Sequence, residues 1–132
     1  MPDYSRKDLS EYRLRKSAEM LASMRRDMDA GDYASANNRA YYSIFHAMRA
    51  VLALDGEDFK KHSAVISCFS KNYLKTDVFP REYGKLISNA SLIRNRSDYE
   101  DFYICSIADT KALVSGAEKF YEAVKSYLTQ VL

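Results

Sequence analysis

Residues that break helices are scarce in this chain, and that scarcity limits the folds open to it. Two prolines and four glycines occur in 132 residues, and no segment alternates between apolar and polar residues as a half-buried strand does. Because Gly and Pro most often end helices, the chain is expected to form a few long helices. With 47% apolar residues, it can bury a core as one domain spanning residues 1–132.

Apolar residues recur at helical spacing in five segments. Ser5 with Asp8, and Ser106 with Asp109, have the spacing of a capping box, Asp32 suits an N-cap, and Pro80 suits the first turn of a helix. Short connections between amphipathic helices favour antiparallel neighbours. The sequence therefore predicts an all-α, up-and-down helical bundle of about five helices, with segments at about 5–29, 32–55, 63–75, 80–98 and 106–131.

The net charge and the absence of known motifs argue against several classes of function. The net charge of +2 is too small to indicate a DNA-coating protein, and the charged first residues do not resemble a signal peptide. No apolar run is long enough to span a membrane, so a cytoplasmic protein is expected. The P-loop, dinucleotide-binding and zinc-protease motifs are absent, and two histidines cannot build a His-rich metal site. We expect neither a metal nor a cofactor.

A polar stripe follows the second predicted helix. Arg39, Tyr42, His46 and Arg49 are three, four and three residues apart, which places them on one helical face. Tyr42 and His46 could be half-buried residues whose polar atoms bond within the bundle. The stripe could instead form the wall of a cleft or a dimer seam, where arginine and tyrosine are frequent anchors.

The densest polar cluster is the segment SLIRNRSDYEDFY, residues 91–103. It could be an ordinary helix end, with arginines placed favourably in the helix dipole and a local Arg94–Asp98 pair. It could also bind phosphate, because guanidinium groups match phosphate oxygens and Asn95 can donate beside them. His62, which follows two lysines, is expected to be a solvent-facing loop residue.

Three segments together resemble the HEPN domain over essentially the whole chain. They are NRAYYSIFHAMRAVLALDG, KKHSAVISCFSKNYLKTD and LIRNRSDYEDFY. The resemblance implies a helical bundle that usually forms a homodimer and is often encoded beside a minimal nucleotidyltransferase in a toxin–antitoxin module. Many HEPN proteins are metal-independent ribonucleases whose motif is an arginine, often a following polar residue, and a histidine four to six residues after the arginine.

The chain matches the first half of that motif with Arg94 and Asn95. No histidine follows His62, and the motif spacing leads from Arg94 to Tyr99 or Asp101, or from Arg96 to Asp101. Histidine can exchange a proton near neutral pH, whereas aspartate is ordinarily ionised and only weakly basic. In some family modules the nucleotidyltransferase adenylylates a tyrosine near the motif, and Tyr103 is the matching position if Arg96 is the motif arginine.

Three functions follow as expectations. The first is a HEPN protein of a two-gene module with a minimal nucleotidyltransferase, dimerising through the face that carries Arg94 and Asn95. The second is an active metal-independent ribonuclease using Arg94 or Arg96 with Asp101, Tyr99 or His46. The third is an accessory domain whose arginines hold a nucleotide phosphate. We expect Arg39, Tyr42 and His46 to lie near Arg94 at a two-fold seam.

Overall fold

The computed structural model describes residues 5–132, so the first four residues of the predicted domain lie outside the described part. The described residues are helical, without strands, as the sequence predicted. Their elements are α1 (Arg6–Asp29), α2 (Tyr33–Leu54), α3 (His62–Phe69), the π-helical turn η1 (Ser70–Leu74), α4 (Tyr83–Tyr99) and α5 (Ile107–Val131). Of these helices, none is both long enough and apolar enough to cross a bilayer.

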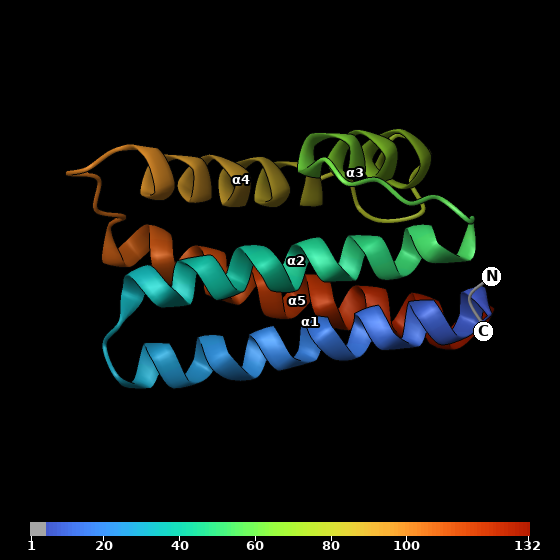
Figure 1. Ribbon diagram of the computed structural model, residues 1–132, viewed down its shortest axis with the longest axis horizontal. Helices are drawn as coiled ribbons and strands as arrows, with labels where there is room; N and C mark the ends of the chain where they lie inside the picture. The colour runs from blue at the N-terminus through green and yellow to red at the C-terminus, as the bar shows by residue number, and fades with distance from the viewer. Residues whose placement is uncertain (1–4) are drawn as a thin grey trace.

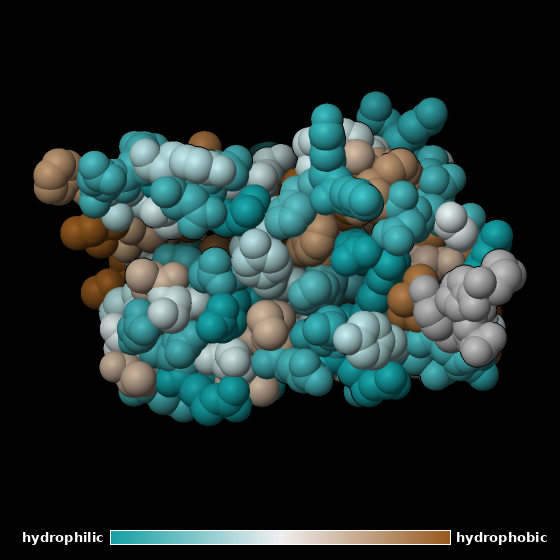
Figure 2. All heavy atoms as spheres, in the orientation of Figure 1, coloured by the Kyte–Doolittle hydropathy of each residue, from teal (hydrophilic) through white to brown (hydrophobic). Residues whose placement is uncertain are grey.

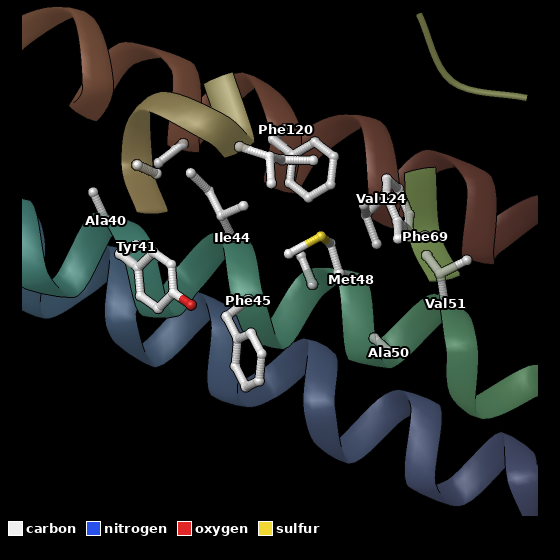
Figure 3. Packing of buried hydrophobic residues seen from close by; sticks show 14 of the residues in the cluster. Ala40, Tyr41, Ile44, Phe45, Met48, Ala50, Val51, Phe69, Phe120 and Val124 are labelled. Atoms are coloured by element: carbon white, nitrogen blue, oxygen red, sulfur yellow. The ribbon is translucent and has the colours of Figure 1, made fainter. Parts of the chain in front are cut away.

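Helix α2 is the central element. It lies between α1 and a row formed by α3 and α4, and α5 runs alongside α1 and α2 (Figure 1). Ile44 and Met48 point from α2 toward Phe120 and Val124 of α5, whereas Tyr41 and Phe45 leave α2 on a different side (Figure 3). The central helix therefore completes the core on one side and presents aromatic rings on another.

Side-chain caps fix the starts of three helices as predicted. Ser5 and Asp8 form both halves of a capping box at α1. Asp32 accepts a hydrogen bond from the backbone N–H of Ser35 at α2. At α5, Ser106 accepts one from the backbone N–H of Asp109, which is one half of the capping box predicted there. These caps accept hydrogen bonds from backbone N–H groups of the first helical turn, which have no partner within the helix.

Two predicted boundaries differ from the structure. Helix α4 begins at Tyr83, three residues after Pro80, because Tyr83 N–H bonds Pro80 C=O in a turn that precedes the helix. The segment predicted as one helix over 63–75 starts at His62 and changes to a π-helical turn at Ser70. A π-helical turn adds a residue per turn, so the 3.6-residue period cannot reveal it.

Buried serines join α1 to α2. Ser17 Oγ donates to Ser43 C=O at 2.7 Å, and Ser10 Oγ donates to Ala50 C=O at 2.7 Å. All three serines are fully buried. Small side chains let two helix backbones approach closely, and the hydrogen bonds satisfy hydroxyls that would otherwise be costly to bury.

Candidate functional site

The floor of the site is an aromatic surface on α2. Tyr41 and Phe45 are four residues apart, so their rings project from the same face and stack at 6.1 Å between centroids. The ring of Tyr42 meets that of Tyr41 edge-on at 5.1 Å. The result is an aromatic platform on which the hydroxyl of the buried Tyr41 is directed along α2 toward Phe45 (Figure 3).

His62 lies on this platform rather than in a solvent-facing loop, so that prediction was wrong. The segment after α2 folds back along it (Figure 1), which makes His62 the first residue of α3. Its ring stacks on Phe45 with 4.1 Å between centroids, and its Nδ1 lies 2.7 Å from the Tyr41 hydroxyl. Helix α3 has no side-chain cap at its start.

Arg94 reaches the same platform from α4. Its guanidinium carbon lies 5.1 Å from the ring centroid of Tyr41 and 5.7 Å from that of Tyr42. Its Nη1 is 3.3 Å from His62 Nδ1, and its Nε is 3.6 Å from an Asp98 carboxylate oxygen. The local Arg94–Asp98 pair is therefore present, but the guanidinium is held mainly over aromatic rings, with 23% of the side chain exposed.

The contacts of His62 indicate its protonation state. A guanidinium has no acceptor, so the Nδ1 atom that faces Arg94 and the Tyr41 hydroxyl must be the acceptor, and the neutral ring carries its proton on Nε2. Desolvation, followed by the positive charges of Arg94 and Arg49, lowers the pKa of His62. Burial raises the pKa of Tyr41, and Arg94 opposes that shift. At neutral pH the cluster is thus an arginine cation beside two neutral groups.

The polar stripe of α2 continues on both sides of this cluster. Arg39 and Arg94 line a hollow of about 240 Å³ between α2 and α4, together with Asn37 and Asp98. Tyr42 contacts Arg94 directly, and the ring of His46 lies one turn further, 6.2 Å from that of Tyr42. The structure thus gathers Arg39, Tyr42 and Arg94, with His46 at the margin.

His46 lies in a basic and half-buried environment. Burial is the main reason that its pKa falls to about 4, and Lys16, Arg49, Arg13 and His62 lower it further. Its Nδ1 is buried without a hydrogen-bond partner among the described residues. At neutral pH the imidazole is therefore uncharged and cannot act as a strong proton donor.

Arg96 points to a different region from Arg94. Two residues along a helix correspond to a rotation of about 200°, so consecutive arginines of this motif diverge. Arg96 pairs with Glu100 at 2.9 Å, and its guanidinium carbon lies 4.4 Å from the ring centroid of Tyr103. Burial, and then a hydrogen bond with Cys105, raise the pKa of Tyr103, which is half-buried.

The remaining motif candidates lie around Arg96 or in solvent. Asp101 is exposed in the α4–α5 connection and lines an outer hollow with Arg96 and Tyr103. Among residues 5–132, no hydrogen bond or ion pair joins Asp101 to Arg94. Asn95 is exposed, and 82% of Tyr99 is exposed. The predicted set therefore divides into a cluster around Arg94 and a cluster around Arg96.

Two important members of the Arg94 cluster were absent from the sequence-based set. Tyr41 reads as part of the apolar stripe of α2, and His62 lies 32 positions before Arg94. Their meeting depends on how the α2–α3 connection folds back, which no local spacing encodes. The one available signal was the pair of adjacent tyrosines on α2, because the hydroxyl of a buried tyrosine usually bonds to a polar partner.

The all-helical fold agrees with the comparison to known proteins. The HEPN domain profile matches residues 10–127, and the chain belongs to the HEPN domain family. A UPF0332 protein of Thermotoga maritima is 29% identical over 118 residues, which cover 89% of each chain. Two proteins of Methanocaldococcus jannaschii bear the name "Putative toxin": one is 29% identical over 76% of this chain and 74% of its own, the other 30% identical over 73% and 65%.

Proposed function

We propose that this HEPN protein is the toxin-type component of a two-gene module whose other product is a minimal nucleotidyltransferase. We propose further that it forms a homodimer through the face of α4 that carries Arg94 and Asn95. Family membership and the names of the two archaeal relatives support the module. The observation that carries the assembly is an exposed group of apolar and aromatic side chains at the end of α4 and in the α4–α5 connection.

That group is unusual for a small chain with a complete core. Phe102 is 97% exposed and Ile104 is 88% exposed. Brown, hydrophobic atoms gather at the end of the molecule where Figure 1 places the α4–α5 connection (Figure 2). Contiguous exposed apolar residues mark interaction surfaces more often than isolated ones do. Leu92 and Tyr99 are also exposed on α4, so the group borders the helix that carries Arg94 and Asn95.

The assembly can be tested by sedimentation equilibrium of the purified protein. A homodimer is expected for the wild type, and Phe102→Ser should shift it toward the monomer. Val78→Ser is the matched control, because Val78 is also an exposed apolar residue, at 45%, but lies before α4. A wild-type monomer, or an equal effect of both variants, would contradict dimerisation through this surface.

The module can be tested by co-expression with a nucleotidyltransferase encoded beside this gene. Co-purification of the two products is expected, and an adenylyl group on Tyr103 is the expected modification. Peptide mass spectrometry locates it, with Tyr103→Phe and Tyr99→Phe as paired variants. Modification that persists in Tyr103→Phe and disappears in Tyr99→Phe would assign the more exposed tyrosine instead. The absence of co-purification would refute the partnership.

A second function, metal-independent cleavage of RNA, is favoured by one observation. Arg94 has an imidazole in contact, that of His62, although the motif position for histidine holds another residue. Arginine can stabilise a phosphorane, and imidazole can exchange protons near neutral pH. RNA degradation in EDTA that Arg94→Ala abolishes and Arg96→Ala leaves intact is the expected result. Equal activity of wild type and Arg94→Ala would exclude this function.

A further inference from the structure

We propose that Asp58, in the connection between α2 and α3, is the residue that positions His62 beside Arg94. Its carboxylate lies between two arginines, Arg13 of α1 and Arg49 of α2, and holds the returning chain against both helices. The use of this position in catalysis rests on the ribonuclease function proposed above. The position itself is measured without any cleavage, so either proposal can fail alone.

The ion pairs of Asp58 are the first argument. Asp58 Oδ1 accepts hydrogen bonds from Arg13 Nη2 at 3.1 Å and from Arg49 Nη2 at 2.9 Å. Arg13 also donates from Nη1 to the backbone C=O of Arg49 at 3.2 Å, so the three residues form one ion-pair cluster. Hydrogen bonds between ionised groups are about twice as strong as those between neutral groups. The cluster therefore joins the connection to α1 and α2 at one point.

The unequal burial of the three side chains is the second argument. The exposed fraction of the side chain is 8% for Arg13 and 26% for Arg49, but 60% for Asp58. A charge removed from water needs a counter-charge, and loss of that partner from a buried pair is costly. The two arginines are fixed in helices, whereas Asp58 lies on an irregular segment. Their buried charge therefore draws the carboxylate, and with it the segment, onto the bundle.

The placement of α3 depends on the segment before it. The α2–α3 connection, residues 55–61, runs back along α2 (Figure 1), and no side chain of the described residues caps the first turn of α3. Phe59 supplies an apolar contact of this segment, because it is half-buried against the core. Lys60 and Lys61 bring two positive charges toward the arginines of this surface. Without the carboxylate of Asp58, these cations would repel the segment from α2.

Phe45 links the ion-pair cluster to the site. The guanidinium carbon of Arg49 lies 5.7 Å from the ring centroid of Phe45, and the ring of His62 stacks on the same ring at 4.1 Å between centroids. Asp58 holds Arg49 through a hydrogen bond and precedes His62 by four residues in the chain. It therefore constrains both groups that contact Phe45. The contact of His62 Nδ1 with Arg94 Nη1, at 3.3 Å, depends on that placement.

Two different roles of Asp58 predict opposite changes in the pKa of His62. Desolvation lowers this pKa, and the positive charges of Arg94 and Arg49 lower it further. If Asp58 acted only as a nearby charge, its removal would leave Arg49 less compensated and would lower the pKa of His62 again. If Asp58 positions the ring, its removal lets the imidazole enter solvent, and the pKa rises toward the ordinary value of 6.5.

The neighbours of His62 make such a rise diagnostic. The titratable and charged groups that face it are Tyr41, Tyr42, His46 and Arg49 of α2, Arg94 of α4 and the preceding Lys61. None of these described neighbours is a carboxylate, so removal of Asp58 raises the pKa of His62 only if the ring moves away from them. His46 is an internal reference, because it belongs to α2 and burial is the main cause of its low pKa.

The test is an NMR titration of the full-length protein, whose two histidines give two imidazole signals that His62→Gln assigns. In Asp58→Asn the titration midpoint of His62 should rise toward 6.5, while that of His46 stays low. Asp58→Glu keeps a carboxylate and should restore most of the wild-type midpoint. Glu57→Gln is the matched control, because it removes the same charge from the neighbouring exposed residue, and it should leave the midpoint of His62 unchanged.

A His62 midpoint that falls or stays in place in Asp58→Asn, or that rises equally in Glu57→Gln, would overturn the proposal. Circular dichroism checks that each variant is folded. If Asp58→Asn is unfolded, Arg13→Lys takes its place, because lysine keeps the buried charge but lacks the planar fork that reaches both Asp58 and the backbone of Arg49. Arg13 is not among the groups that shift the pKa of His62, so a rise of the midpoint in this variant supports positioning, and an unchanged midpoint refutes it.

Discussion

Replacement of His46 by glutamine should make the protein less sensitive to mild acid. The imidazole of His46 has a pKa of about 4 in the folded chain, against 6.5 for an ordinary histidine, mainly because it is buried. The unfolded chain therefore binds more protons than the folded chain between these two values. The wild type loses stability as the pH falls from about 6.5 toward 4, and the loss is complete below 4.

The size of the effect follows from the two pKa values. At pH 5 the full shift would correspond to about 2 kcal/mol of lost unfolding free energy. Because the ring is only half-buried, solvent screening reduces this to about 1 kcal/mol. For a domain of this size, 1 kcal/mol lowers the melting temperature by about 3–4 °C. Glutamine does not titrate, so His46→Gln should not lose this part of its unfolding free energy as the pH falls.

Urea denaturation at pH 7 and pH 5 measures the difference directly. The wild type should lose about 1 kcal/mol more between the two pH values than His46→Gln does. His62→Gln is the comparison, because His62 also has a lowered pKa but is less buried. Equal losses of unfolding free energy in the wild type and in His46→Gln would show that the pKa of His46 is not lowered in the folded chain.

Three further predictions concern the fold that supports the site. Phe120 is completely buried against α2, so Phe120→Ala should lower the unfolding free energy by about 3–5 kcal/mol in urea denaturation. Ser17→Ala removes a buried donor to Ser43 C=O and should cost about 1–2 kcal/mol in the same assay. Ser106→Ala removes the N-cap of α5 and should cost about 1 kcal/mol, while Ser106→Asn should restore most of it. An unchanged denaturation midpoint in any of the alanine variants would contradict the corresponding contact.

Local chemistry explains what could be predicted of the fold. The caps at Ser5, Asp32 and Ser106 involve residues three apart, so their spacing in the sequence already contains the interaction. The start of α4 was placed too early because proline is compatible both with a first helical turn and with the preceding turn. The π-helical turn after Phe69 leaves no trace in the apolar period.

The site was predicted less completely, for a different reason. Arg94 and its i+4 partner Asp98 could be read from one helix, and so could the shared face of Arg39, Tyr42 and His46. The contact of Arg94 with His62 joins two helices through a connection whose path depends on packing against α2. The motif spacing led instead to Asp101, which lies beyond the end of α4, where helical geometry no longer holds.

The uneven burial of α2 and α4 has a consequence for motion. Helix α2 is buried along most of its length, whereas α4 buries only Ile87 and Ala90. Local opening is cheapest where few apolar contacts must be broken, so amide hydrogens of α4 should exchange faster than those of α2. Arg94 therefore belongs to the helix that opens more readily. Tyr41 and Tyr42, whose rings contact its guanidinium, belong to the helix that remains folded. The two halves of the site can then separate and rejoin while the core remains folded.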